Sequence, residues 1–317
     1  MPKLFVIFGA TGQQGGSLLT YMLSHPEFSR FYHFRAITRD ASKPTAEKLR
    51  EKGVEVVEAD MGKPETLSAA VSGAYGVFSV TNYWESRDAA IEITQGKAVA
   101  DAARAAGVSL FIWSSLPNVT KFSNGELTTV HHFDSKAEVE DYIRTISFPS
   151  CVFIMTAFFM QNIWSPIIAP PKVDANLTYG QLDNGTVLFN FAWNPLDRIP
   201  YIDITDIGKY LAPALRDPVK YNNSRLTAAT AYYSAKELVD LLSEVSGKNV
   251  VLPTEAEIPL LTDDPMKQML ARPPVLFTKW GYYGPTGEQD LEWTLAQMDE
   301  RPKTLKQFLE DNGPWFQ

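Results

Sequence analysis

The amino-acid sequence predicts an α/β protein, with a doubly wound parallel sheet and a smaller α+β domain at its C-terminal end. Two observations lead to this prediction. Short apolar runs alternate with amphipathic stretches over residues 1–156, and a glycine-rich turn joins the first run to the first amphipathic stretch. Continuously apolar strands separated by helices are typical of a parallel sheet covered on both faces. Residues 157–317 break this pattern, so we expect a second, smaller domain there that is partly interleaved with the first.

Six runs rich in β-branched and aromatic residues are the expected strands of the sheet. They are Leu4–Phe8, Phe31–Thr38, Val54–Glu58, Tyr75–Val80, Ser109–Trp113 and Cys151–Met155. Helices are expected between them at Gln13–Ser24, Pro64–Val71, Ala89–Ala106 and Ser135–Ile146. In the last of these, apolar residues recur at the spacing of a helix with one buried face. Because crossovers between parallel strands are right-handed, this order leaves few alternative topologies.

The second half of the chain has a different composition. Residues 157–200 are rich in Pro, Asn, Gly and aromatic side chains and show little periodicity. Beyond them we expect short strands at Ile199–Ile202 and Arg225–Ala228, and helices at Asp206–Leu215, Ser234–Ser246 and Thr304–Glu310. Several aromatic residues are candidates for the wall of an apolar substrate pocket, although core packing is their commoner role. They are Phe158, Trp164, Phe189, Trp193 and Trp280.

Composition and charge exclude several classes of protein. The 317 residues carry a net charge of −8, which argues against sequence-independent binding to nucleic acids or to anionic membranes. No run approaches the roughly 18 apolar residues of a membrane span, and the first residues do not form a signal peptide. Cys151 is the only cysteine, and the four histidines lack metal-ligand spacing. We therefore expect a cytoplasmic protein without a metal site.

The strongest local motif is Gly9-Ala10-Thr11-Gly12-Gln13-Gln14-Gly15, which follows the first strand and opens the first helix. Gly9 permits the tight turn, Gly12 lets a pyrophosphate approach the backbone, and Gly15 lets the helix pack on the strand. Free N–H groups at the start of the helix then bind the phosphates. The spacing G-x-x-G-x-x-G is that of short-chain dehydrogenase-like sheets. The motif therefore predicts a Rossmann-type, dinucleotide-binding sheet.

The end of the second strand selects between cofactors. An acidic residue there holds the ribose hydroxyls of NAD, whereas a basic residue accommodates the 2′-phosphate of NADP. This strand ends in Arg39, whose planar guanidinium suits a phosphate, and Lys43 lies a few residues beyond. Asp40 is expected to cap the following turn or helix. These residues predict NADP(H) rather than NAD(H).

Two further strand ends are expected to contact the cofactor, because open parallel sheets bind ligands where their strands end. Asp60 and Met61 follow the third strand and are expected beside the adenine. Thr81, Asn82 and Tyr83 follow the fourth and are expected beneath the ribose and nicotinamide. The plainer alternative for Asp60 and Asn82 is that each binds its own backbone.

The catalytic centre of a short-chain dehydrogenase is incomplete in this sequence. Those enzymes use a tyrosine, a lysine four residues later and a serine after the fifth strand. Ser114 and Ser115 fill the serine position, but His132 stands in place of the tyrosine, followed by Lys136. Lys136 lies where a helix is expected to begin, a poor place for a cation, which indicates that another group, such as a nicotinamide ribose, holds it. His132 is able to donate a proton near neutral pH, although a neutral imidazole suits this task less well than a phenol. A surface lysine and a loop histidine are the alternatives.

Several motifs resemble those of the NmrA-like family, most strongly its NADPH-sensing members. They are the glycine turn, Thr38-Arg39, Thr81-Asn82-Tyr83-Trp84-Glu85-Ser86, Gln95-Gly96-Lys97, the run from His132 to Glu140, and Phe159-Met160-Gln161-Asn162. The resemblance implies a Rossmann domain over residues 1–156 and a smaller domain over residues 157–317. It also implies NADP(H) contacts from Gly9 to Gly15, Arg39, Lys43, Asp60, Met61, Thr81 to Tyr83, Lys136, Phe159, Met160, Gln161 and Asn162.

Two functions stay open. Family members include redox sensors and negative regulators of transcription, so the resemblance implies an NADP(H)-responsive regulator. It would bind a protein partner such as a transcription factor, in the cytoplasm and also in the nucleus, as a monomer or a homodimer. The alternative is an NADPH-dependent reductase of an apolar carbonyl, imine or enone, in which Lys136 orients the nicotinamide and His132, Ser115 or Tyr83 donates the proton. Direct DNA binding is disfavoured by the net charge.

Overall fold

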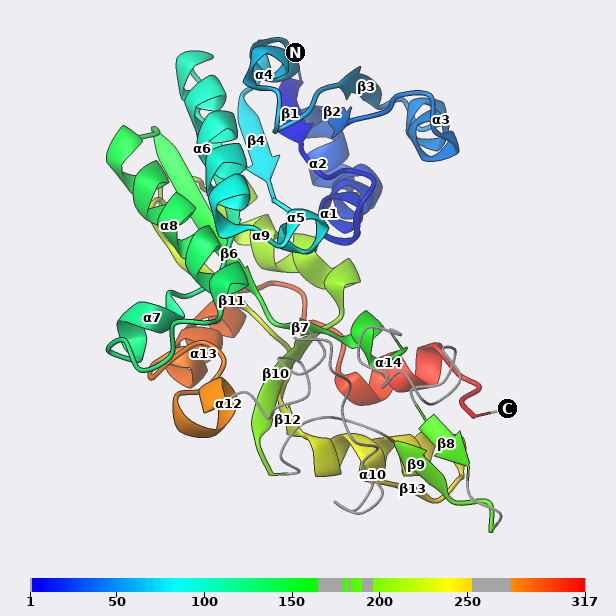
Figure 1. The fold of residues 1–317 in the computed structure, drawn as a ribbon. Helices are drawn as coiled ribbons and strands as arrows, with labels where there is room; N and C mark the ends of the chain where they lie inside the picture. Colours follow the sequence, from blue (N-terminus) through cyan, green and yellow to red (C-terminus); the bar gives the residue numbers. More distant parts are fainter. Residues whose placement is uncertain (1, 165–178, 182–183, 190–195, 253–274, 317) are drawn as a thin grey trace. The chain divides into compact units, whose positions relative to one another are not determined.

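The computed structural model describes residues 2–164, 179–181, 184–189, 196–252 and 275–316 (Figure 1). The chain divides into two units. The first, called the sheet unit below, comprises Met1–Thr156, Ile204–Ala228 and Glu288–Arg301. The second unit comprises Ala157–Asp203, Ala229–Gly287 and Pro302–Gln317. Each unit is described separately.

The sheet unit is built on seven strands in the order β11-β6-β5-β4-β1-β2-β3. All neighbouring strands in this sheet are parallel. The strands are β1 (Lys3–Ile7), β2 (Tyr32–Thr38), β3 (Glu55–Glu58), β4 (Gly76–Ser79), β5 (Leu110–Ser115), β6 (Ser150–Thr156) and β11 (Arg225–Ala228). This arrangement confirms the doubly wound parallel sheet that the alternation of apolar runs and helices predicts.

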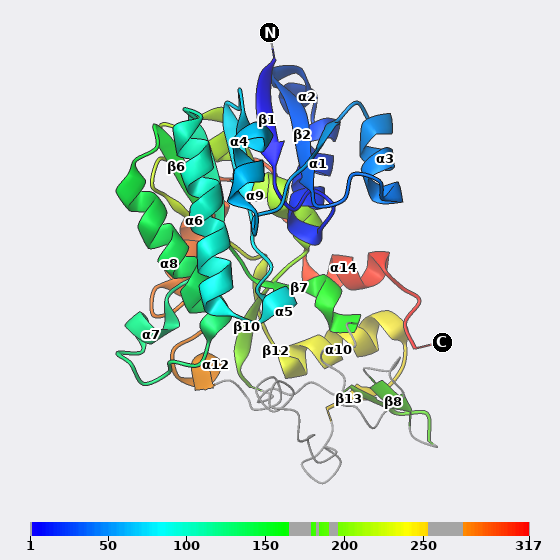
Figure 2. The same cartoon turned by 45° about the horizontal axis from the view of Figure 1, so that its top comes forward.

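Helices α4 (Leu67–Val71), α6 (Ala89–Ala105) and α8 (His131–Ile146) cover one face of this sheet. Alternate residues of β1, Leu4 and Val6, pack into a core with Val99 of α6 and Val139 of α8. Figures 1 and 2 both show α6 and α8 side by side. A Cβ atom at Gly96 would lie 2.8 Å from the Val139 methyl groups, so the close approach of these two helices depends on glycine.

Helices α1 (Gln13–Ser24), α2 (Pro26–Phe31) and α9 (Ile207–Arg216) form the other helical group of the sheet unit. Phe5 of β1 and Phe28 of α2 are fully buried there and pack with Tyr32. Helix α1 lies against α9, where a Cβ atom at Gly208 would lie 2.2 Å from the Tyr21 ring. The opposite faces of the sheet are therefore both covered, as a parallel sheet requires.

A buried carboxylate joins the last strand of the sheet to α8. Glu140 is fully buried and accepts hydrogen bonds from Arg225 Nε at 2.7 Å, Arg144 Nη2 at 2.8 Å and Ser115 Oγ at 2.6 Å. Strand β11 has the bounds predicted from the sequence, and it is the seventh strand of the sheet although it lies in the second half of the chain. Residues 204–228 and 288–301 are thus the segments of the second half that belong to the sheet unit.

The described residues of the second unit form two small sheets, in the orders β12-β10-β7 and β13-β9-β8. Its strands are β7 (Phe158–Phe159), β8 (Tyr179–Gln181), β9 (Val187–Phe189), β10 (Arg198–Ile202), β12 (Ala231–Ser234) and β13 (Val250–Val251). Its helices include α10 (Ala235–Ser246), α12 (Val275–Lys279), α14 (Leu305–Asp311) and the short η2 (Met160–Trp164). Ser234 and Thr304 begin α10 and α14 with capping boxes, which explains why the sequence predicts both helices closely.

Helix α13 (Gly287–Gln297) is about three turns long. The shorter elements are α3 (Pro44–Glu51), η1 (Pro64–Thr66), α5 (Tyr83–Ser86), α7 (Val119–Phe122) and η3 (Ile204–Asp206). Within the described ranges, no helix has both the length and the apolar character needed to span a bilayer.

Candidate cofactor-binding site

The strand order of the sheet places the predicted cofactor residues at one edge. The chain runs from β1 to β2 and β3 on one side, and from β4 to β5 and β6 on the other, so the order reverses between β1 and β4. Doubly wound sheets bind nucleotides at this reversal, outside the carboxyl ends of the strands. The glycine turn follows β1, Arg39 follows β2, and Thr81 follows β4. These loops therefore meet at the edge where a dinucleotide is expected.

The glycine turn has the geometry that its spacing predicts. Gly9 has φ +66°, in the left-handed region, and its carbonyl accepts a hydrogen bond from the Gly12 N–H at 2.9 Å. A Cβ atom at Gly15 would lie 2.5 Å from the Gly9 carbonyl oxygen, so any larger residue would push α1 off the strand. No side chain caps the start of α1, and its first turn holds no acidic residue. The start of this helix is therefore suited to an anion.

The two serines at the end of β5 face different partners. Ser114 Oγ donates a hydrogen bond to Gln14 Oε1 at 2.7 Å and so ties the end of β5 to the glycine turn. Ser115 is fully buried and donates to Glu140 at 2.6 Å. Successive residues of a strand point to opposite faces. Ser115 therefore holds the Glu140 carboxylate, and this contact argues against the expectation that Ser115 donates a proton to a substrate.

Lys136 is buried against the carboxylate of Glu92, which is not among the predicted site residues. Its ammonium donates to Glu92 Oε1, and its longer contact to Thr81 Oγ1 measures 3.2 Å. Glu92 is only 1% exposed and also accepts hydrogen bonds from Ser135 Oγ and, at 2.7 Å, from Thr81 Oγ1. Three donors therefore converge on one buried carboxylate, which fixes where the ammonium of Lys136 lies.

This contact corrects the interpretation of Lys136. Helix α8 begins at His131, four residues before the predicted start, so Lys136 lies in its second turn. The true start carries no sequence signal, because Val130 provides no side-chain cap and the Asp134 carboxylate instead accepts from the Val119 N–H at 2.6 Å. In this structure the group that holds the buried lysine is the Glu92 carboxylate.

A sequence signal for Glu92 exists in α6. The buried residues of this helix recur at helical spacing and are Glu92, Gly96, Val99, Ala100 and Ala103. Glu92 is the one charged residue of that stripe. A charged residue on an otherwise apolar helical face needs a buried partner of opposite charge. The position of Glu92 therefore predicts a buried cationic partner, and the structure shows that this partner is Lys136.

Burial sets the protonation of the two titratable groups near the start of α8. Burial lowers the pKa of Lys136, while the Glu92 carboxylate opposes that shift. For His132, burial and the positive charge of Lys136 lower the pKa to about 3. The His132 ring packs against the Trp84 ring, with centroids 4.8 Å apart, and against Tyr83. His132 is therefore neutral near pH 7, the state less suited to proton donation, and its role as an acid stays a prediction.

Arg39 makes a second ion pair, with a different environment. Its guanidinium donates to the Glu85 carboxylate of α5, and the two side chains are 62% and 50% exposed. This hydrogen bond raises the pKa of Arg39. Asp40 accepts from the Ser42 N–H at 2.9 Å and so caps the turn as predicted. Lys43 is exposed at the start of α3.

The other predicted contacts at this edge have local partners. Asp60 Oδ1 accepts from the Gly62 N–H at 2.8 Å, which is the plainer backbone role considered for this residue. The charge of the Asp60 carboxylate also acts on Arg39. Met61 packs partly against the core of the sheet, and Asn82 is exposed just before α5. The cofactor contacts proposed for these three residues stay predictions.

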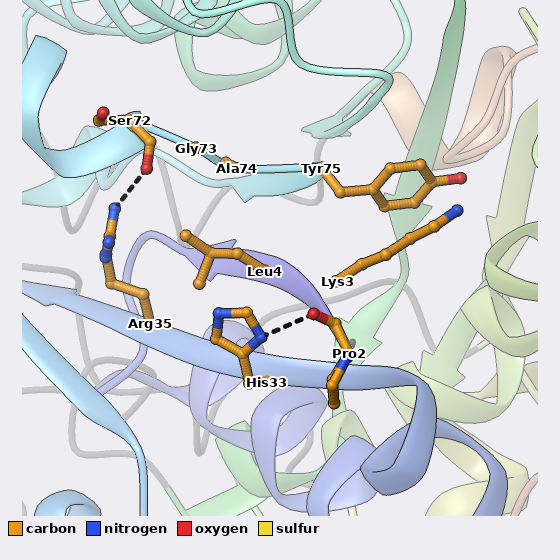
Figure 3. A pocket seen from close by; sticks show the side chains of 9 residues that line it. All are labelled: Pro2, Lys3, Leu4, His33, Arg35, Ser72, Gly73, Ala74 and Tyr75. Carbon is orange, nitrogen blue, oxygen red and sulfur yellow. Dashed lines mark hydrogen bonds between the residues drawn. The ribbon is translucent and has the colours of Figure 1, made fainter.

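Figure 3 shows a pocket at the opposite edge of the sheet. Its volume is about 770 Å³, and it is lined by Pro2, Lys3, Leu4, His33, Arg35, Ser72, Gly73, Ala74 and Tyr75. These residues lie at or near the amino ends of β1, β2 and β4. Doubly wound sheets bind nucleotides at the carboxyl ends of their strands, so this pocket is separate from the predicted cofactor site.

The predicted residues after β6 belong to the second unit. Phe159 ends β7, and Met160, Gln161 and Asn162 begin η2, where Gln161 Nε2 donates to Asp203 Oδ1 at 2.6 Å. Their cofactor contacts stay predictions. Two of the aromatic residues considered for a substrate pocket pack within this unit: Phe158 contacts Tyr201, and Phe189 is fully buried. Trp164 is the last residue of η2, and Trp280 is partly buried. Trp193 lies outside the described residues.

A seven-stranded parallel sheet with a glycine turn at its reversal defines a dinucleotide-binding protein of the Rossmann class. Within that class, the chain belongs to the NmrA-like family, whose family model matches residues 1–309. This match confirms the family resemblance that the motifs indicate.

Known proteins of similar sequence and structure agree with this assignment. The NmrA-like family domain-containing oxidoreductase lnaB of Aspergillus flavus is 28% identical over 263 residues, which cover 80% of this chain and 77% of the relative. The solved structure of NmrA, a negative transcriptional regulator, in complex with NADP has a TM-score of 0.79 at 20% identity and covers 98% of this chain and 95% of its own. The NADPH-dependent quinone oxidoreductase QOR2 of Escherichia coli, complexed with NADPH, has a TM-score of 0.70 at 20% identity and covers 97% and 99%. At these identities the two structures establish the shared fold, and the cofactors they hold agree with the predicted NADP(H).

Proposed function

We propose that the sheet unit binds NADP(H) at the carboxyl edge of its strands. The phosphates would lie at the uncapped start of α1, and the 2′-phosphate would contact Arg39. The observation that carries this proposal is the glycine turn: Gly9 has a left-handed φ and Gly15 has no room for a side chain. This geometry leaves the helix start open to an anion. Lys136 is buried beside Thr81. Thr81 belongs to the loop after β4, where the nicotinamide ribose is expected.

We further propose that the cofactor acts as a signal, and that the chain is an NADP(H)-responsive regulator working through a protein partner. This role is supported by the groups around Lys136, which are poor proton donors. His132 is neutral near pH 7, Ser115 is bound to Glu140, and no tyrosine lies four residues before Lys136. A ligand shifts a conformational or partner equilibrium only if it binds the two states unequally. The regulator role therefore requires that bound and free forms differ measurably.

A reductase of carbonyl, imine or enone compounds is the second candidate. It is supported by the name of lnaB, an oxidoreductase, and by Tyr83, whose pKa is raised by burial. NADPH would supply the hydride. Tyr83 would stay protonated at neutral pH and would be the remaining phenol able to donate a proton, while Lys136, held by Glu92, would orient the ribose.

Calorimetric titration of the full chain tests the binding proposal. We expect NADPH to bind more tightly than NADH, and Arg39→Met to weaken NADPH by about 10- to 100-fold while leaving NADH nearly unchanged, because hydrogen bonds between charged groups contribute about 1.5–3 kcal/mol. Arg30→Met, at an exposed arginine of α2, is the matched control. Equal affinity for NADPH and NADH in the wild type would refute the role of Arg39.

A second experiment separates the regulator from the reductase. NADPH consumption is measured with a panel of carbonyls, imines and enones, and solution scattering and partner capture are compared with and without NADPH. The regulator predicts no consumption and a changed shape or partner binding. Turnover that is lost in Lys136→Met and in Tyr83→Phe would establish the reductase instead.

A further inference from the structure

The exposed Arg39–Glu85 pair joins two loops of the expected cofactor edge. Arg39 follows β2, and Glu85 lies in α5, which follows β4. The guanidinium Nη1 donates to Glu85 Oε1. In the proposed function, this guanidinium is the group that recognises the 2′-phosphate of NADP(H). The protein therefore presents one of its own carboxylates to the arginine expected to bind the ligand.

Both members of this pair are reachable from solvent. The Arg39 side chain is 62% exposed, and that of Glu85 is 50% exposed. Exposed ion pairs contribute little to stability, because water solvates both charges well when they separate. Replacement of the Glu85 carboxylate by another anion at Arg39 therefore costs the protein little stability. Separation of a buried ion pair would cost much more.

A 2′-phosphate and the Glu85 carboxylate compete for the same guanidinium. A phosphate binds arginine best through two parallel hydrogen bonds, and Glu85 already uses one edge of this fork. If the carboxylate stays, it repels the phosphate, since charges of equal sign a few ångströms apart interact unfavourably. If it leaves, the ion pair is lost. NAD(H) has a 2′-hydroxyl in this position and meets neither cost.

We propose that Glu85 is a specificity-determining residue, which occupies Arg39 in the free protein and limits the preference for NADP(H) over NAD(H). The inference rests on the proposed function, because it assumes that the 2′-phosphate is bound at Arg39. Under this proposal, binding of NADP(H) frees Glu85, whereas binding of NAD(H) leaves the pair in place.

Calorimetric titration of NADPH and NADH into Glu85→Gln tests the proposal. The substitution keeps the size of the side chain and removes its charge. We expect NADPH to bind about three- to tenfold more tightly than to the wild type, and NADH to bind with the same affinity, in keeping with the size of an exposed charge interaction. The gain is expected to shrink as salt is added, because salt screens exposed charges.

Two controls make the result specific. Glu292→Gln removes the charge of an exposed glutamate of α13 and should leave both affinities unchanged. In an Arg39→Met background, Glu85→Gln should improve NADPH binding less than it does in the wild type, because no ion pair remains to be broken and only the repulsion between the carboxylate and the 2′-phosphate is relieved. An NADPH affinity in Glu85→Gln that is equal to or weaker than that of the wild type would overturn the role of Glu85. Absence of NADPH binding by the wild type would instead overturn the proposed function, so the two failures are distinguishable.

Discussion

Two ion pairs at the same edge of the sheet differ in almost every physical respect. Glu92 of α6 holds Lys136 in the interior, where the two side chains are 1% and 10% exposed. Glu85 of α5 holds Arg39 at the surface, where both side chains are at least half exposed. Both acids lie in the short stretch of chain that follows β4, and both bases are predicted cofactor contacts.

The different burial of the two pairs decides which of them is able to exchange partners. Breaking a buried pair leaves a charge without water or partner, at a large cost, so Lys136 is expected to stay on Glu92 whether or not a cofactor is bound. Breaking an exposed pair costs little, so Arg39 is free to exchange its partner. The buried pair fixes the position of the Lys136 ammonium. In the exposed pair, the Glu85 carboxylate is a partner of Arg39 that another anion is able to replace. The predictions below test this division, beginning with the largest effect.

Removal of the buried acid should destabilise the protein most. Glu92→Ala leaves the Lys136 ammonium buried without its carboxylate, and we expect the free energy of unfolding to fall by about 3–5 kcal/mol. Urea denaturation followed by circular dichroism measures this change. The control is Glu138→Gln on α8, which breaks the more exposed pair with Lys97 of α6 and should cost less than about 1 kcal/mol. Similar losses in the two variants would contradict the division.

Removal of both buried charges should restore much of this loss. In Glu92→Leu combined with Lys136→Met, neither charge of this buried pair remains, and apolar groups of similar size replace the two side chains. We expect the double variant to regain about 2 kcal/mol or more relative to Glu92→Ala. Denaturation of both variants under the same conditions checks this. A double variant no more stable than Glu92→Ala would show that the pair is not the main contribution of Glu92.

The neutral state of His132 should make stability depend on pH. Burial lowers its pKa to about 3 in the folded protein from the 6.5 of an unperturbed histidine, so the unfolded chain binds more protons between these values. Stability should therefore fall as pH decreases from 6.5 toward 3, with a contribution of up to about 1.4 kcal/mol per pH unit. His132→Gln should have a shallower slope over this window. An unchanged slope in the variant would show that protonation of His132 does not contribute to the pH dependence of stability.

Breaking the exposed pair should have the smallest effect on stability. Glu85→Gln leaves Arg39 in water, and we expect the free energy of unfolding to change by less than about 1 kcal/mol. Thermal and urea denaturation in low and high salt measure it. A loss comparable to that of Glu92→Ala would mean that the Arg39 pair is structural and is not available for exchange.

The sequence predicts those parts of the fold that depend on neighbours in the chain. The glycine turn, strand β1 before it, helix α1 after it and the capped helices α10 and α14 all carry local signals, and each is found within a residue or two of its predicted bounds. Helix α8 is the exception, because Val130 gives its start no capping signal. The membership of β11 in the large sheet depends on pairing with β6, about seventy residues earlier, which no local pattern specifies.

The candidate site divides in the same way. Arg39 and Lys136 are recognisable from their positions after a strand and in a motif. Their acidic partners are 46 and 44 residues away along the chain, and only the packing of α5 and α6 brings them together. Glu92 left a trace as a charge on an apolar helical face, but Glu85 left none, because an exposed glutamate on a short helix is common. Side-chain pairing across loops is therefore the part that sequence reasoning missed.

A crystal structure of the full chain with NADPH bound would show directly which of the two pairs opens. We predict that the Lys136–Glu92 contact persists, while Arg39 turns from Glu85 to the 2′-phosphate. A complex in which Arg39 stays on Glu85 and the 2′-phosphate binds elsewhere, or in which Lys136 leaves Glu92, would contradict it.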